Sequence, residues 1–204
     1  RRPLPLQPTA ARYFPLRTAA HSGSRLPLNK APPAYIIYVT MYPWKGGICK
    51  LNQYDRKLYD YIVQRGIKAE HMVFEKSCHS VQEAADAVGA SPEDLVKNIC
   101  LVDDSGSLIV AIVKGEDRVS TKKVGQALGI APPRPASVEE ILEKTGYPCG
   151  GVPSFSYNAR YLVDQRVMEK EYVYTGGGSE YSLIKITPAE LVKANGAQVA
   201  NIRK

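Results

Sequence analysis

Apolar positions recur with two different periods along residues 51–204, which predicts that helices and strands are mixed in one domain. Apolar residues three or four apart behind a capping side chain predict helices at residues 53–65, 81–88, 92–98, 121–128, 138–144 and 188–195. Short apolar runs bounded by turn residues predict strands at residues 71–75, 99–102, 108–113, 160–164, 171–175, 181–185 and 199–202. Because strands and helices do not alternate strictly, we expect an α/β protein of the α+β kind. Its sheet would be mixed, largely antiparallel and barrel-like, surrounded by short helices.

Helix starts are marked clearly in this part of the chain. Ser80, Ser137 and Thr187 each precede an apolar run and have a glutamate three residues later, which is the pattern of a capping box. Ser91 is followed by a proline and two acidic residues, which predicts another helix start. The helix predicted there places Lys97 near a helix C-terminus, immediately before an apolar strand.

The first 50 residues differ from the rest in composition. Residues 1–33 have no helical or strand period, and their prolines prevent a long helix. A strand-sized apolar run follows at residues 34–39. Three interpretations stay open: a disordered basic tail, a transit-like segment, and an upstream extension with Met41 as the true start. We therefore divide the chain into a basic, Pro/Arg-rich N-terminal extension, residues 1–50, and a folded domain, residues 51–204.

Charge follows the same division. Residues 1–50 contain eight Lys or Arg and no Asp or Glu, which leaves −1 for residues 51–204 out of a total of +7. A basic protein attracts polyanions, but here the basicity belongs to the N-terminal segment. The overall charge is therefore weak evidence for RNA binding by the folded domain.

The metal-binding and nucleophilic residue types show no familiar spacing. The four cysteines form no CxxC pair and the three histidines have no metal-ligand spacing, so we predict no metal and no cofactor. Buried free thiols are typical of a reducing, cytoplasmic protein. No G-x-S-x-G motif is present, and no apolar run approaches the roughly 18 residues of a membrane span. A hydrolase of this sequence would have to activate water without a familiar nucleophile.

Three other features each allow two interpretations. The glycine-rich segments at residues 146–153 and 176–179 match no nucleotide-binding fingerprint, so they are either tight turns or the rim of a pocket. Lys97 either belongs to a site or compensates a helix dipole. The cluster Arg118, Lys122 and Lys123 either contacts phosphate or lies on a solvated helix face.

The order of these motifs resembles the YbaK/prolyl-tRNA-synthetase-associated domain family. The matching segments are residues 79–85, 95–98, 117–123, 150–153 and 176–179, and the resemblance extends over about residues 73–202. Each motif alone is weak, whereas five in order make a specific match. The resemblance implies a mixed, nearly barrel-shaped sheet and hydrolysis of the ester that joins a wrong amino acid to tRNA. Proline tRNA that carries alanine or cysteine is the expected substrate.

Site residues follow from the resemblance. The family's signature lysine falls on Lys97, and the implied catalytic set is Lys97, Gly150 and Gly151, with glycine N–H groups of both loops as donors to the reacting carbonyl. The implied substrate-binding residues are Phe74, Asn98, Val152, Pro153, Ser154, Gly177, Gly178, Ser179 and Ser182. The implied tRNA-binding residues are Arg118, Lys122 and Lys123. The chain departs from the family pattern at Cys149, where a GxxxP loop would have glycine, and at Ser182, where relatives often have His or Asp.

The resemblance implies an aminoacylated tRNA as partner and an aminoacyl-tRNA synthetase as a further candidate, without a membrane. Two alternatives to a deacylase stay open: a non-catalytic tRNA- or synthetase-binding module, and a small-ligand regulator that uses the same pocket. The edited amino acid, the tRNA determinants and the oligomeric state are left open.

Overall fold

The computed structural model describes residues 39–41 and 51–204. The predicted extension, residues 1–50, lies outside the described residues apart from the short strand β1 (Val39–Met41). β1 pairs in parallel with β2. The strand-sized run at residues 34–39 and the alternatives for the N-terminal segment otherwise fall on residues that the structure does not describe.

The described strands form two sheets. The four-stranded sheet has the order β1-β2-β8-β7, and the five-stranded sheet has the order β5-β3-β4-β6-β9. The strands of the first sheet after β1 are β2 (Ala69–Val73), β7 (Val173–Gly176) and β8 (Ser182–Ile186). Those of the second are β3 (Val96–Val102), β4 (Leu108–Lys114), β5 (Arg134–Pro135), β6 (Arg160–Asp164) and β9 (Gln198–Ala200).

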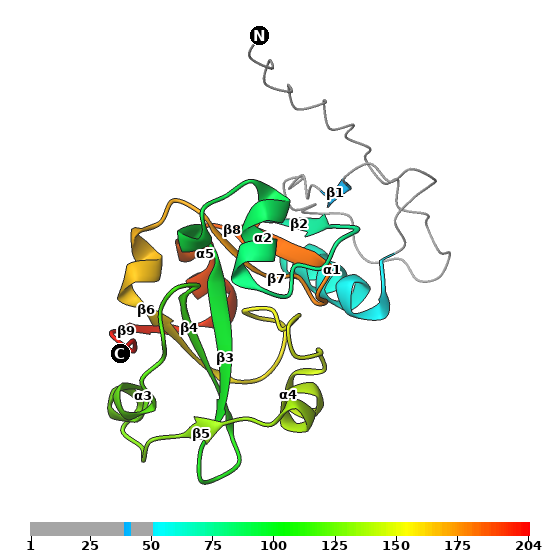
Figure 1. Ribbon diagram of the computed structural model, residues 1–204. Helices are drawn as coiled ribbons and strands as arrows, with labels where there is room; N and C mark the ends of the chain where they lie inside the picture. The colour runs from blue at the N-terminus through cyan, green and yellow to red at the C-terminus, as the bar shows by residue number, and fades with distance from the viewer. Residues whose placement is uncertain (1–38, 42–50) are drawn as a thin grey trace, which may run out of the picture.

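The prediction of a mixed sheet is confirmed, but the sheets do not close into one barrel. Pairings β2–β8, β7–β8, β3–β4 and β3–β5 are antiparallel, whereas β1–β2, β4–β6 and β6–β9 are parallel. Between β3 and β7 the described residues form a single bridge, Leu95 to Tyr174. The two sheets therefore meet just before the start of β3, and from there β3 runs away from the four-stranded sheet toward β5 (Figure 1).

The predicted helices are confirmed at all positions but one. They are α1 (Gln53–Arg65), α2 (Val81–Val88), α3 (Thr121–Leu128), α4 (Val138–Thr145) and α5 (Pro188–Asn195). The capping boxes at Ser80 and Ser137 are both formed. At Thr187 the cap hydroxyl accepts the N–H of Glu190. Figure 1 shows α3 and α4 on either side of β5 at one end of the five-stranded sheet. None of the helices in the described part of the chain has the length and apolar character that a bilayer crossing requires.

The helix predicted at residues 92–98 is wrong. The capping signals at Ser91 produce only a 3₁₀ turn, η1 (Pro92–Asp94), which the Leu95 N–H closes on the Pro92 carbonyl. A second 3₁₀ segment, η2 (Gln165–Glu169), follows β6. From Val96 onward the chain pairs with β4 in a register that begins at Val96–Lys114. The long-range ladder overrides the local helix signal, and as a result Lys97 lies in a strand.

The hairpin of β3 and β4 runs through the core. Every residue of β4, Leu108–Lys114, is buried. Its side chains enter two apolar clusters on opposite faces of the sheet, because successive strand residues point to opposite sides. Lys114 is only 4% exposed and forms an ion pair with Glu116 at 3.1 Å.

Candidate functional site

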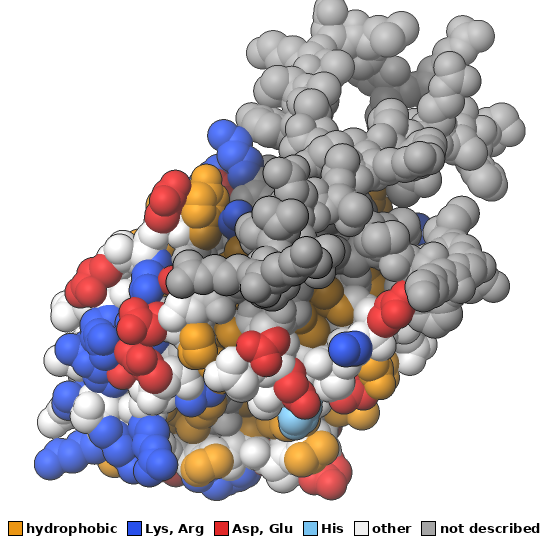
Figure 2. Space-filling model, turned by 45° about the horizontal axis from the view of Figure 1, so that its top comes forward, with side chains coloured by type: hydrophobic (Ala, Val, Ile, Leu, Met, Phe, Trp, Pro, Cys, Tyr) orange, Lys and Arg blue, Asp and Glu red, His pale blue; other side chains and the backbone are white. Residues whose placement is uncertain are grey.

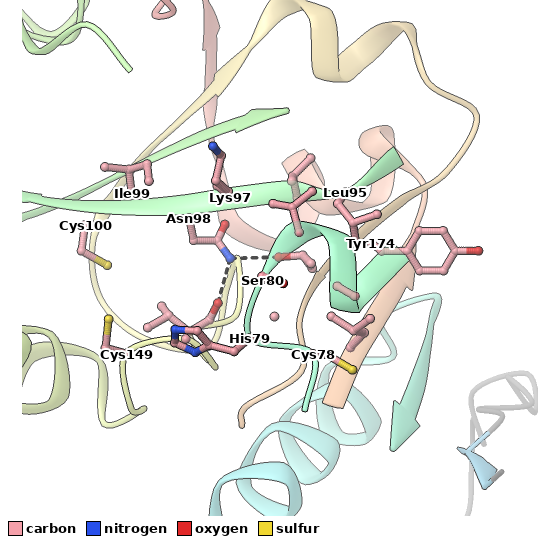
Figure 3. A pocket seen from close by; sticks show the side chains of 18 of the residues that line it. Cys78, His79, Ser80, Leu95, Lys97, Asn98, Ile99, Cys100, Cys149 and Tyr174 are labelled. Carbon is pink, nitrogen blue, oxygen red and sulfur yellow. Dashed lines mark hydrogen bonds between the residues drawn. The ribbon is translucent and has the colours of Figure 1, made fainter. Parts of the chain in front are cut away.

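A cavity of about 190 Å³ lies where β3 passes the two glycine loops, residues 148–154 and 176–179 (Figure 3). We call it the central cavity. Residues from α2 and the segment before it, from β3, α4, β7 and β8, and from the first glycine loop line it. They are Cys78, His79, Ser80, Val81, Ala84, Leu95, Val96, Lys97, Asn98, Ile99, Cys100, Ile141, Cys149, Gly150, Val152, Tyr174, Thr175, Gly176 and Leu183.

A closed hydrogen-bond network forms one wall of the central cavity. The Asn98 amide donates to the Val152 carbonyl at 2.8 Å and to Thr175 Oγ1 at 2.9 Å. Ser154 Oγ donates to Asn98 Oδ1 at 2.7 Å. Ser154 Oγ also lies 2.7 Å from Thr175 Oγ1, and since its proton goes to Asn98, the Thr175 hydroxyl donates in that contact. Asn98 therefore connects the hairpin to the first glycine loop and to Thr175, the residue immediately before the second.

The two glycine loops pack on each other through their main chains. The Gly178 N–H donates to the Gly151 carbonyl at 2.9 Å. A Cβ atom on Gly176 would clash with the Val152 carbonyl, and one on Gly151 would clash with the main chain of Ser179. Glycine is required here because backbone approaches backbone without room for a side chain.

This packing uses most of the glycine N–H groups that the sequence offers as donors to a ligand. Gly151 donates to Pro148, Gly177 to Ser182 and Gly178 to Gly151. The Gly150 N–H has no main-chain acceptor among the described residues, and Gly150 borders the central cavity. Of the predicted donors, Gly150 is thus the one whose N–H is not used by the main chain of the described residues.

The edge of β3 supplies a second main-chain donor. The Cys100 carbonyl accepts the Ala136 N–H at this edge, whereas the Leu95 carbonyl faces the β4 side, where it accepts the Gly115 N–H. Since residues two apart in an antiparallel strand face the same neighbour, the main-chain groups of Asn98 point to the Cys100 side. β5 covers that edge only at Leu101 and Val102 among the described strands, so the Asn98 N–H has no main-chain acceptor in the described part of the chain.

Three thiols and one imidazole surround the cavity. Burial raises the pKa of Cys78 to about 11 and that of Cys100 to about 12, which keeps both thiols protonated at neutral pH. Cys149 is exposed, and its thiol faces that of Cys100 in Figure 3. The exposed His79 ring packs over Gly150, where a Cβ atom would meet its Nδ1. No hydrogen bond joins His79 to any of these thiols among the described residues, so the site contains no formed Cys–His dyad.

Lys97 is half-buried and points from β3 to the side opposite to Asn98 (Figure 3). It forms no ion pair with the described residues. It lines the central cavity and also a second cavity of about 220 Å³, which we call the side cavity. The other residues of the side cavity are Ile99, Leu101, Asp117, Arg118, Val119, Thr121 and Pro135. Lys97 therefore stands between two hollows and is not directed into the central one alone.

Ser182 lies behind the second glycine loop in a buried polar cluster. Its hydroxyl donates to Asp55 Oδ1 of α1 at 2.7 Å and accepts the Ser179 N–H at 3.2 Å. His71 is fully buried nearby, close to the Asp55 carboxylate and the Gly177 main chain but without a well-formed hydrogen bond to either. Burial lowers the pKa of His71, against the opposing effect of Asp55. The cluster holds the glycine loop from behind, and Ser182 does not line the central cavity.

The predicted site residues separate into three groups. Four of them line the central cavity, namely Lys97, Asn98, Gly150 and Val152. A second group supports its wall from behind and comprises Gly151, Pro153, Ser154, Gly177, Gly178, Ser179 and Ser182. The predicted substrate-binding residue Phe74 lies in an apolar cluster with Met72 and Leu183 and does not line the cavity.

The basic cluster lies on the other side of β3. Arg118 lines the side cavity, Lys122 is exposed at the start of α3, and Lys123 donates to the Arg203 carbonyl at 2.8 Å. Figure 2 shows Lys and Arg side chains gathered on the side that carries α3 and the C-terminus in Figure 1, with acidic side chains between them.

Sequence reasoning did not assign Thr175, His79 or Asp55 to the site. Thr175 is the last residue of β7 before the glycine run, which begins at Gly176, and that position was its only local signal. Asp55 lies 127 residues from Ser182 in the chain, so no local pattern could have joined the two.

Comparisons with known proteins identify the family of this chain. A family model described as the aminoacyl-tRNA editing domain matches residues 75–194, which contain every residue of the Asn98 network. This chain belongs to the aminoacyl-tRNA editing domain family.

Individual relatives extend the comparison. The uncharacterized protein YwhH of Bacillus subtilis (strain 168) is 30% identical over 120 residues, covering 58% of this chain and 76% of that protein. The proline--tRNA ligase of Desulfotalea psychrophila is 27% identical over 100 residues, 49% of this chain but only 17% of the ligase. A solved structure of a protein proposed as a trans-editing enzyme for prolyl tRNA synthetase is 30% identical, with a TM-score of 0.71, covering 76% of this chain and 99% of that one. The family and this neighbour support a role in tRNA editing and confirm the fold class.

Proposed function

We propose that the protein hydrolyses the ester bond of mischarged aminoacyl-tRNA. The observation that carries this proposal is the central cavity, which lies within the family-matched segment. It is bordered by the main-chain N–H groups of Gly150 and Asn98, which have no main-chain acceptor among the residues that the structure describes. A volume of about 190 Å³ is small beside the roughly 300–1,000 Å³ of sites for drug-sized ligands. It suits an aminoacyl group and leaves the nucleotides of the substrate outside.

Main-chain donors carry the electrostatic part of the proposed reaction. Water attacks the ester carbonyl, and the N–H groups of Gly150 and Asn98 stabilise the negative charge that develops on its oxygen. The bond to the tRNA ribose then breaks, and the ribose oxygen leaves with a proton. The network of Asn98, Ser154 and Thr175 keeps the two donors at a fixed separation, which is the condition for such stabilisation.

Alanine or cysteine on proline tRNA is the proposed substrate. The small cavity supports a small side chain, and the likeness to a protein proposed as a trans-editing enzyme for prolyl tRNA synthetase supports proline tRNA. A prolyl-tRNA synthetase is a proposed partner. We place the protein in the cytoplasm, where its free cysteines Cys78, Cys100 and Cys149 would stay reduced.

The test is a deacylation assay with alanyl- and cysteinyl-tRNA for proline, together with other mischarged tRNAs. We expect the wild type to release a small amino acid and Asn98→Ala to lose most of this activity. Arg56→Ala, which removes an exposed side chain on α1, serves as the control. Binding of tRNA without cleavage of any ester would overturn the deacylase and favour the non-catalytic binding module.

A further inference from the structure

The central cavity does not account for the side cavity, which lies across β3 from it. The two cavities share Lys97 and Ile99 as wall residues. No described strand pairs with the outer edge of β3 at these two residues, because β5 reaches only Leu101 and Val102. The cavities are therefore neighbours over an uncovered strand edge, and a ligand too long for one can continue into the other.

The side cavity carries a net positive charge, because its acidic residue is paired and, within the described residues, its two basic residues are not. Asp117 is its acidic residue, and Arg166 neutralises it with contacts of 3.0 and 3.4 Å. Lys97 and Arg118 also line the cavity, and neither forms an ion pair with the described residues. Two cations without carboxylate partners beside a neutralised acid are suited to a phosphate group.

Apart from Thr121, the remaining lining is apolar, and the backbone around it is held in place. Ile99, Val119 and Pro135 are at least partly exposed and give it an apolar surface that the face of a base can cover. The loop that carries Arg118 is fixed by the C-terminal segment. The Lys204 N–H donates to the Arg118 carbonyl and the Ser120 N–H to the Ile202 carbonyl, both at 2.8 Å. Arg118 is thus an exposed cation on a backbone held in place.

We propose that the side cavity binds a nucleotide of the single-stranded 3′ end of the aminoacylated tRNA. Its phosphate lies between Arg118 and Lys97, and its base lies on the apolar floor. The inference rests on the proposed function, since it assumes that the ester occupies the central cavity. It gives Lys97 a role in positioning the substrate across the strand edge, and it makes the two cavities parts of one binding path.

The experiment compares two substrates of different length. One is alanyl-tRNA for proline, and the other is 3′-O-alanyl-adenosine, which contains the ester but no phosphate. For Arg118→Gln we expect KM for the tRNA to rise about tenfold, the scale of one charge-assisted contact, and Arg118→Glu should raise it further. Both variants should cleave alanyl-adenosine like the wild type. Arg56→Gln, the same substitution at an exposed α1 position, should change neither.

A binding measurement separates this inference from the proposed function. A fluorescent minihelix with a single-stranded 3′ end is titrated at several salt concentrations against wild type, Arg118→Gln and Arg56→Gln. Loss of one phosphate contact lowers the slope of log affinity against log salt by about 0.7, and we expect this for Arg118→Gln alone. If the wild type cleaves neither ester, the proposed function fails, and the salt slope still decides on the side cavity. An unchanged slope, or equal loss on both substrates, would overturn the inference.

Discussion

The β3–β4 hairpin and the paired glycine loops form opposite walls of the central cavity, and they are held in different ways. The hairpin is stabilised by side-chain burial, with every residue of β4 inside the core. The loops are stabilised by main-chain contact and by the Asn98 network. We infer that the hairpin determines how stable the domain is, whereas the loops determine the shape of the cavity. Stability and activity should therefore respond separately to changes in the two walls.

The largest loss of stability is expected in the hairpin. Ile112 of β4 is fully buried, and Ile112→Ala should lower the free energy of unfolding by about 2–5 kcal/mol, through lost burial and the space left behind. The folded fraction should keep its deacylase activity within about twofold. Urea denaturation followed by an assay at low temperature measures both, and a large loss of activity per folded molecule would contradict the division between the two walls.

In the glycine loops we expect a small loss of stability and a large loss of activity. Gly176→Ala would press a Cβ atom against the Val152 carbonyl. Stability should fall by about 1–3 kcal/mol. Activity should fall by about 100-fold, because a small displacement of the donors suffices for such a loss.

Gly196→Ala is the matched control for this substitution. Gly196 ends α5 with φ of 66° and has open space at the Cβ position. It should lose only about 1 kcal/mol for the left-handed conformation and keep its activity. Equal activity of the two alanine variants would show that close packing of the loops does not shape the site.

Asn98 joins the hairpin to the first glycine loop and to Thr175, so a substitution there removes the hydrogen bonds between the two walls. Asn98→Ala leaves the buried Ser154 and Thr175 with only each other, and the expected loss of stability is about 1–3 kcal/mol. The rate of ester cleavage and the urea concentration at the midpoint of unfolding should both fall. Asn98→Asp should be no better, because a carboxylate has no N–H to donate to the Val152 carbonyl. Recovery of activity in Asn98→Asp would mean that the side chain acts on the substrate and not on the loops.

The buried polar cluster of Asp55, His71 and Ser182 behind the second glycine loop should make stability depend on pH. The pKa of His71 is lowered on folding, mainly by burial, so the unfolded chain takes up this proton first. Stability from this group is fully present above the unfolded pKa of about 6.5. This contribution is lost as the pH falls from there toward the lowered pKa of His71 in the folded state, at up to about 1.4 kcal/mol per pH unit. In urea titrations at pH 7.5, 6.5 and 5.5, His71→Leu should show a shallower decline than the wild type, and an equal decline would contradict this role of His71.

The smallest effect is expected at Cys149, the exposed thiol that faces Cys100 of the hairpin across the cavity. If water attacks the ester, Cys149→Ser should keep activity within about twofold in the deacylation assay. Loss of activity in this variant, with a covalent aminoacyl adduct on the wild type by mass spectrometry, would replace the water mechanism.

The hairpin and the loops also differ in how well the sequence predicts them. Apolar runs on either side of Asp103–Ser107 predict the hairpin, because side-chain alternation is a local property. At Ser91 equally good local signals predict a helix through Asn98, and the β4 ladder overrides them. The glycine loops are recognisable as motifs, but their sequence does not say which N–H groups are free.

By itself the sequence determined the helix caps, most of the strands and the family to which the motifs belong, because these depend on residues close together in the chain. The tertiary structure decided the rest. It directs the Lys97 side chain away from Asn98. It also pairs the Gly178 N–H with the Gly151 carbonyl and the Ser182 hydroxyl with the Asp55 carboxylate. Each of these depends on which distant segments come to lie side by side. Hydrogen-bonding groups that are equivalent in the sequence are therefore divided by long-range packing into those that hold the fold and those left to meet a substrate.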